Sequence, residues 1–263
     1  MTTRYMPPSD SHELAGRVAV VTGGGVGIGR AIAHRVAAAG AVVVVAGRRI
    51  DALEAVRGEI LELGGRSGAV VTDVRDRGAV AALISGTVEK HGRIDILVNN
   101  AGVVVPPSPI ASFDEDAFER LFAVNTTSVF LGMRYALPHM IAQRSGVILN
   151  ISSVSAVRNV KNLGPYAATK HAVDALTRAA ATENGRWGIR VNALLPGPTR
   201  TRMVVGRDDA PTGADTEFAR QVPLGRIGEP DEQAEAALFL VSDRSSFING
   251  ASLLADGGLA WVD

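Results

Sequence analysis

Val18-Ala-Val-Val-Thr22, followed directly by Gly23-Gly-Gly-Val-Gly-Ile-Gly29, is the stretch that decides the fold. Its first five residues are a compact apolar run of the kind that forms a buried strand. The glycines let the backbone turn sharply, and residues 30–39 continue as a helix that Gly40 ends. A strand, a glycine-rich turn and a helix in this order are typical of the start of an α/β domain.

The rest of the chain repeats this alternation of short β-rich runs and helical segments. Several of the runs are apolar throughout, which predicts a parallel sheet covered on both faces. We therefore expect an α/β, single-domain, doubly wound (Rossmann) fold with a seven-stranded parallel sheet and helices on both faces. The predicted strands are 18–22, 42–45, 69–72, 94–98, 146–151, 189–194 and 251–255.

Residues 13–263 are predicted to form this domain, and the polar residues 1–12 a flexible N-terminal tail. Asp51-Ala-Leu-Glu54 has the pattern of a capping box that opens a helix. Residues 200–222 hold two glycines and a proline among few apolar side chains. We expect this irregular segment to be a substrate lid, with a plain surface loop as the alternative.

Composition excludes several classes of function. The chain has 27 basic and 27 acidic residues, so neither nucleic acid nor an anionic membrane is expected as a partner. It has no cysteine, which excludes disulfides and cysteine-based zinc sites, and its five histidines lack metal-ligand spacing. No metal site is predicted. Neither a signal peptide nor an apolar run of transmembrane length is recognisable, so a cytoplasmic location is expected.

The glycine loop is the candidate nucleotide site. Its missing side chains allow a pyrophosphate to approach, and the following helix N-terminus offers unpaired N–H groups; a plain flexible turn is the alternative. Enzymes that use NAD usually place an acid about 20 residues further on. Here Gly47 is followed by Arg48 and Arg49, and two guanidinium groups suit a 2′-phosphate. The sequence predicts NADP(H), with NAD(H) possible and a solvated basic turn as the alternative.

Ser153, Tyr166 and Lys170 are the candidate catalytic residues. Tyr166 and Lys170 are four apart and share one face of a predicted helix, and Ser153 lies at the end of a predicted strand. A phenol, an ammonium and a hydroxyl beside a nucleotide can move a proton while the cofactor moves a hydride. Only three of the 27 basic residues are lysines, and Lys170 is one of them. A surface lysine beside a half-buried tyrosine is the alternative. Lys161, between Ser153 and Tyr166, is either solvated or a contact for an anionic substrate.

Several motifs in order resemble the short-chain dehydrogenase/reductase family in its form of about 250 residues. Besides the features above they are Asp73-Val74, Asn99-Asn-Ala-Gly102, Pro196-Gly-Pro-Thr-Arg-Thr201 and Asp256-Gly-Gly258. The stretch Pro223–Pro230 is similar to that of members that reduce 3-oxoacyl thioesters. The candidate cofactor-binding residues are Gly23, Gly25, Gly27, Ile28, Gly29, Arg48, Arg49, Asp73, Val74, Asn99, Ala101, Gly102, Tyr166, Lys170, Pro196, Gly197, Thr199 and Thr201.

The resemblance implies reversible hydride transfer between NADP(H) and a carbonyl compound or secondary alcohol. It gives Tyr166 the role of proton donor, Ser153 that of holding the substrate oxygen, and Lys170 that of lowering the pKa of Tyr166 and binding the cofactor ribose. It adds Asn125, which would anchor a proton-relaying water. It also implies a homotetramer or homodimer. The alternatives are an NAD-preferring alcohol, steroid or sugar dehydrogenase, and a noncatalytic NAD(P)-sensing protein on the same fold.

Overall fold

The computed structural model describes residues 12–205 and 213–262. Within them, seven parallel strands form one sheet in the order β3-β2-β1-β4-β5-β6-β7. The strand order reverses between β1 and β4, and in such sheets ligands bind at the carboxyl ends beside the reversal. The strands are β1 (Val18–Thr22), β2 (Val42–Gly47), β3 (Arg66–Val71), β4 (Ile96–Asn99), β5 (Gly146–Ile151), β6 (Ile189–Pro196) and β7 (Ser252–Ala255).

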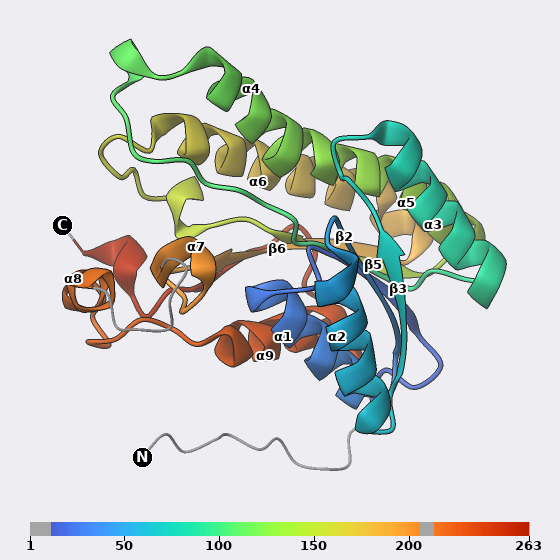
Figure 1. The fold of residues 1–263 in the computed structure, drawn as a ribbon. Coiled ribbons are helices and arrows are strands. Elements are labelled where there is room, and N and C mark those ends of the chain that lie inside the picture. Colours follow the sequence, from blue (N-terminus) through green and yellow to red (C-terminus); the bar gives the residue numbers. More distant parts are fainter. Residues whose placement is uncertain (1–11, 206–212, 263) are drawn as a thin grey trace.

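Helices cover both faces of the sheet (Figure 1). One layer consists of α1 (Gly27–Ala38), α2 (Ile50–Glu62) and α9 (Pro230–Val241), and the other of α3 (Arg77–His91), α5 (Ser128–Gln143) and α6 (Gly164–Asn184). Successive strand residues enter opposite layers, so Ala19 and Val21 pack under α1 and α9 while Val20 packs under α3, α5 and α6. The predicted doubly wound α/β fold is confirmed.

The predicted capping box at Asp51 is wrong. Helix α2 begins one residue earlier, at Ile50, and its N-cap Arg49 makes no side-chain capping bond. Asp51 lies instead in the first turn, where its negative charge is favourable beside the helix N-terminus. Strand β3 begins at Arg66 rather than at residue 69, because it pairs with β2 along its whole length.

The predicted irregular segment 200–222 contains two short helices, α7 (Arg202–Val205) and α8 (Gly213–Gln221). Residues 206–212 lie outside the described residues, as do residues 1–11 of the predicted tail. The segment is therefore not irregular throughout, and its role as a substrate lid stays a prediction. In Figure 1, α8 lies on the same side of the molecule as the last described residues of the chain.

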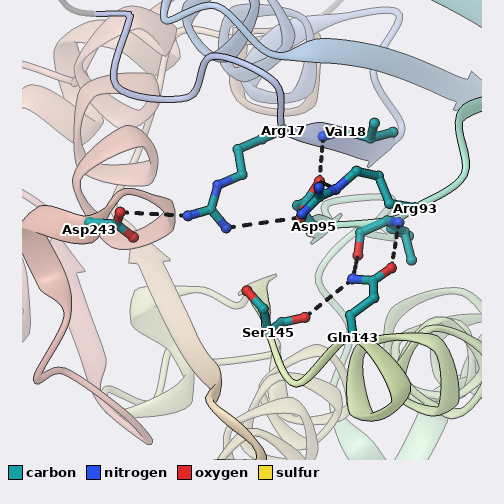
Figure 2. A network of polar contacts seen from close by, with 8 residues as sticks. Arg17, Val18, Arg93, Asp95, Gln143, Ser145 and Asp243 are labelled. Atoms are coloured by element: carbon teal, nitrogen blue, oxygen red, sulfur yellow. Dashed lines mark hydrogen bonds and ion pairs between the residues drawn. The ribbon is translucent and has the colours of Figure 1, made fainter.

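A buried carboxylate joins the amino ends of the strands (Figure 2). Asp95, which is fully buried, accepts from the backbone N–H of Val18 at 2.8 Å and from the guanidinium of Arg93 at 2.6 and 2.8 Å. Arg17 lies between Asp95 and Asp243, at 4.0 and 3.6 Å. A buried charge is tolerated when it is paired and hydrogen-bonded in this way. This network fixes β1 against β4 at the edge opposite the candidate site.

Candidate active site

The three candidate catalytic side chains converge at the carboxyl end of β5. Ser153 follows this strand by two residues and caps the short helix η3 (Val154–Ala156), its Oγ accepting from the N–H of Ser155 at 3.1 Å. The hydroxyl of Ser153 is hydrogen-bonded to the phenol of Tyr166. One helical turn further along α6, the ammonium of Lys170 lies 5.8 Å from the centre of the tyrosine ring. The structure thus brings together the serine, tyrosine and lysine.

Lys170 is buried, with 4% of its surface exposed. Its Nζ donates to the carbonyl oxygen of Ile151 at 3.0 Å. Burial lowers the pKa of Lys170 to about 8, because the charged form loses its hydration. The amine therefore exchanges its proton near neutral pH.

Burial also raises the pKa of Tyr166, and the hydrogen bond from Ser153 opposes this rise only in part. Lys170 is not among the causes of this shift, and its expected lowering of the tyrosine pKa stays a prediction. One low-dielectric environment disfavours both charged forms, the phenolate and the ammonium. The phenol keeps its proton at neutral pH, which suits a proton donor.

Asn125 connects two segments that border the site. It is buried within η2 (Ala123–Thr127), a π-helical turn between α4 (Glu115–Phe122) and α5. Its Oδ1 accepts from the N–H of Val103 at 2.8 Å, and its Nδ2 donates to the carbonyl of Val103 at 2.9 Å and to Thr169 at 3.2 Å. The side chain thus ties the loop after β4 to α6, and its predicted part in proton relay stays a prediction.

The glycine loop approaches the end of β4 closely. Gly23 has a φ of +65°, and a Cβ at this position would lie 2.8 Å from the side chain of Asn100. A Cβ at Gly29 would lie 2.3 Å from the carbonyl oxygen of Gly23. Asn100 Nδ2 donates to the carbonyls of Thr22 and Gly23 at 2.9 and 3.3 Å, which locks the loop. Asn100 is absent from the predicted site residues, although its place in the motif after β4 was a signal for it.

The other residues of the Asn99–Gly102 motif either form hydrogen bonds within the fold or lack a side chain beside Lys170. Asn99 is buried and donates to Asn150 on β5 at 2.9 Å, so its side chain stabilises the sheet. Ala101 donates its N–H to Thr22 Oγ1 at 3.1 Å. A Cβ at Gly102 would lie 3.7 Å from Lys170 Nζ, within ordinary contact. The glycine therefore leaves space beside Lys170 Nζ, and the predicted contact of Lys170 with a cofactor ribose stays a prediction.

Basic side chains gather where β2 and β3 end. Arg48 and Arg49 are exposed between β2 and α2. Asp73 forms an ion pair with Arg75 at 2.6 Å, and Arg75, together with the more distant charge of Arg48, lowers the pKa of Asp73 to about 2. Val74 beside it is buried. Arg75 is a residue of this edge that sequence reasoning missed, and the predicted contact with a 2′-phosphate stays a prediction.

The stretch from Pro196 to Thr201 closes the opposite side. A Cβ at Gly197 would lie 2.6 Å from the backbone of Asp256, so only glycine fits there. Thr199 is buried, and its hydroxyl donates to the carbonyl of Gly197 at 3.0 Å. Thr201 lies against Gly27 of the glycine loop, where a Cβ would come within 3.2 Å of its methyl group.

Two other predicted loop residues contact neighbouring helices. A Cβ at Gly25 would lie 3.2 Å from Ala52 of α2, and the side chain of Ile28 packs on the core beneath α1. A nucleotide would therefore meet the backbone of Ile28 rather than its side chain. Glycines that permit close approach at the N-terminus of α1 fit a pyrophosphate. The residues present thus fit a nicotinamide dinucleotide.

Two cavities are lined in part by residues of the segment between Ser153 and Tyr166. The larger, of about 850 Å³, lies between α8 and the C-terminal residues. The smaller, of about 510 Å³, is bordered by Ile110 and Val160. Lys161 is exposed next to it. Within residues 12–205 and 213–262, no cluster of three or more metal-ligating side chains occurs, and no helix is both long and apolar enough to cross a bilayer.

Several known proteins resemble this chain in sequence over nearly its whole length. Residues 24–260 match the family model described as "Enoyl-(Acyl carrier protein) reductase". Levodione reductase of Leifsonia aquatica is 38% identical over 257 residues, which are 95% of this chain and 96% of that protein. Cis-4-hydroxycyclohexanecarboxylate dehydrogenase of Sinomonas cyclohexanicum is 41% identical over 249 residues, covering 95% and 98% of the two chains.

Solved structures agree with the sequence comparison. The crystal structure of levodione reductase has a TM-score of 0.91 and covers 95% of this chain and 100% of its own. A gluconate 5-dehydrogenase from Burkholderia cenocepacia J2315, in complex with NADP and tartrate, has a TM-score of 0.88 at 36% identity and covers 97% and 99% of the two chains. By sequence, fold and the arrangement of its site, this chain belongs to the short-chain dehydrogenase/reductase family.

Proposed function

We propose that this oxidoreductase transfers a hydride between NADP(H) and a ketone or secondary alcohol, with Tyr166 as the group that moves the proton. The observation that carries the proposal is the Tyr166 phenol, hydrogen-bonded to Ser153 and one helical turn from the buried Lys170. The alternative, a noncatalytic sensor of NAD(P), does not require such an arrangement.

Each catalytic side chain has a distinct role. The glycine loop would hold a nicotinamide dinucleotide, which would supply or accept the hydride at the carbonyl carbon. Ser153 holds the substrate oxygen beside the phenol, and Tyr166 donates its proton to that oxygen as negative charge develops on it. Lys170, with a pKa of about 8, returns a proton toward the tyrosine, and the backbone carbonyl of Ile151 keeps the amine in place.

Three arginines support the preference for NADP(H). Arg48 and Arg49 directly follow Gly47, the last residue of β2, and no acidic residue stands at these positions. Arg75 neutralises the nearby Asp73. Guanidinium groups bind phosphate oxygens in bidentate geometry. The NADP in the gluconate 5-dehydrogenase structure belongs to a relative that is 36% identical, which adds support. Use of NAD(H) is the alternative.

The relatives give the substrate class to test first. The compound that gives the dehydrogenase from Sinomonas cyclohexanicum its name carries a hydroxyl group on a six-membered ring. Cyclic ketones and alcohols are therefore the leading candidates, ahead of 3-oxoacyl thioesters, steroids and sugars. A homotetramer or homodimer and a cytoplasmic location also remain proposals. The exposed apolar residues Phe118 of α4 and Phe130 of α5 support self-association.

The test is oxidation of NADPH, followed by its absorbance, against cyclic ketones, 3-oxoacyl thioesters, steroid ketones and sugars, with NADH in parallel. Turnover of one class that disappears in Tyr166→Phe is the expected result. If no ketone is reduced, oxidation of the corresponding alcohols with NADP⁺ and NAD⁺ follows. Tight cofactor binding without turnover in either direction would favour the sensor alternative.

A further inference from the structure

The larger cavity has a charged lining. It has a volume of about 850 Å³, and its described lining includes the guanidinium groups of Arg158 and Arg220 but no carboxylate. Thr216 and Gln221 add neutral polar groups, and Val222 is among the apolar ones. Two like charges beside one cavity repel each other unless an anion lies between them.

Arg158 is held so that most of its donors remain available. Within the described residues, Nη1 donates to the carbonyl oxygen of Leu259 at 2.8 Å. A guanidinium has five N–H donors in a planar fork, and this bond uses one of them. The side chain is therefore fixed by the C-terminal turn and still able to bind a planar anion.

Arg220 of α8 also lines the cavity. It lies in the last turn of α8 and is exposed. A cation is favourable at this end of a helix, so the helix stabilises the charge before any ligand binds. The two arginines come from segments that are about 60 residues apart in sequence, and only the fold brings them to one cavity.

Val222 links the cavity to the segment that follows Ser153. Val154, directly after Ser153, packs against Val222 and Leu259, and Val222 also lines the cavity. The backbone N–H of Arg158 donates to the carbonyl of Val154 at 2.9 Å, so the chain turns back within one turn of Ser153. A substrate whose oxygen lies at Ser153 would thus extend its far end toward the two arginines.

We propose that Arg158 and Arg220 form a subsite for a carboxylate carried by the substrate. The subsite rests on the proposed function, because it selects among ketones and alcohols that react at Tyr166. A carboxylate accepts two parallel hydrogen bonds from a guanidinium, and such charge-assisted pairs are stronger than neutral ones. The distance between the carboxylate and the reacting carbon is bridged by the body of the substrate, which packs against the apolar side chains.

The test uses two ketones that differ only in the carboxylate, cyclohexanone and 4-oxocyclohexanecarboxylate. The wild-type protein is expected to reduce the carboxylate with a kcat/KM at least about tenfold higher. Arg158→Gln and Arg220→Gln are each expected to raise KM for the carboxylate about tenfold or more, with kcat/KM for cyclohexanone unchanged. The matched control is Arg244→Gln, an exposed arginine at the amino ends of the strands.

The rate of cyclohexanone reduction distinguishes failure of the carboxylate subsite from failure of the proposed function. If both ketones react equally well and the variants change neither, the carboxylate subsite is wrong while the reductase assignment stands. If neither ketone reacts, calorimetric titration of cyclohexanecarboxylate into the protein with saturating NADP⁺ decides. Binding that weakens in both variants, but not in Arg244→Gln, supports the subsite. Equal binding by all four proteins, or none by the wild type, overturns it. Arg158→Gln also removes the hydrogen bond to the carbonyl of Leu259, which can disturb folding. Arg220→Gln is therefore the second, independent variant.

Discussion

The ammonium of Lys170 donates to the carbonyl oxygen of Ile151 at 3.0 Å. Ile151 is the last residue of β5, and Ser153 follows two residues later. This bond therefore fixes the helix that carries Tyr166 and Lys170 against the strand that positions Ser153. Because the acceptor is a neutral carbonyl, it stabilises the buried cation less than a carboxylate would, and burial sets the pKa of about 8.

This burial makes the stability of the protein depend on pH. Below about pH 8, Lys170 carries its proton in both states, and the folded state bears the cost of burying the charge. As the pH rises from about 8 toward the unfolded value of 10.5, only the folded state loses the proton, so the free energy of unfolding increases. Between pH 7 and 9.5 we expect Lys170 to contribute an increase of about 2 kcal/mol.

Urea unfolding of the wild-type protein and of Lys170→Met at these two pH values measures this contribution. The comparison cancels groups that titrate in both proteins. The variant should lack the increase of about 2 kcal/mol that the wild type shows. Equal pH dependence in the two proteins would mean that burial does not lower the pKa of Lys170.

Tyr166→Phe tests the proton donor. The ring and its packing remain, but the hydroxyl that reaches Ser153 is lost, so kcat should fall by about 10²–10⁴. The melting temperature and the affinity for NADPH should change little, since the phenol is not an anchor of the fold. Activity close to that of the wild type would transfer the proton-donor role to another group.

Several parts of the site followed from the sequence because they rest on local chemistry. The glycine loop is a strand, a sharp turn and a helix N-terminus in consecutive residues, and the Tyr166–Lys170 spacing is one helical turn. The fold followed from apolar runs that repeat along the chain. Each of these patterns involves residues that are close together in the sequence, so a single sequence is enough to show it.

The properties that the sequence did not show depend on contacts between distant segments. The pKa of Tyr166 is set by burial that only the packed protein has, and sequence reasoning considered the charge of Lys170 instead. Arg75 belongs to the group of charged side chains after β2 and β3 because it pairs with Asp73 near Arg48. Helix α2 begins at Ile50, with Arg49 as an N-cap that makes no side-chain bond, so the local capping pattern at Asp51 is not used.

Two glycines should respond differently to the same substitution. Gly102→Ala places a Cβ 3.7 Å from Lys170 Nζ, an ordinary contact, so the protein should fold and melt within a few degrees of the wild type. The methyl group fills the space above Lys170, and KM for NADPH should rise about tenfold or more. Gly29→Ala places a Cβ 2.3 Å from the carbonyl of Gly23, so it should lower the melting temperature as well.

Thermal unfolding and cofactor titration of both variants distinguish the two roles. A Gly102→Ala protein with unchanged cofactor affinity would show that the ribose does not occupy this space. A Gly29→Ala protein as stable as the wild type would show that the loop can move away from Asn100, despite the hydrogen bonds of this side chain to Thr22 and Gly23.

Arg48→Glu tests the cofactor preference. The guanidinium is replaced by a carboxylate, while Asp73 nearby stays paired with Arg75, so a 2′-phosphate would meet the negative charge of the introduced side chain where it had met a positive one. The ratio of kcat/KM for NADPH to that for NADH should fall about tenfold or more, because a charge-assisted hydrogen bond contributes about 1.5–3 kcal/mol. Arg57→Glu is the control, since Arg57 lies in α2, the helix that follows Arg48, but pairs with Glu54 at 2.7 Å. A ratio that falls equally in both variants reflects net charge alone, and a ratio that neither variant changes places the choice of cofactor elsewhere.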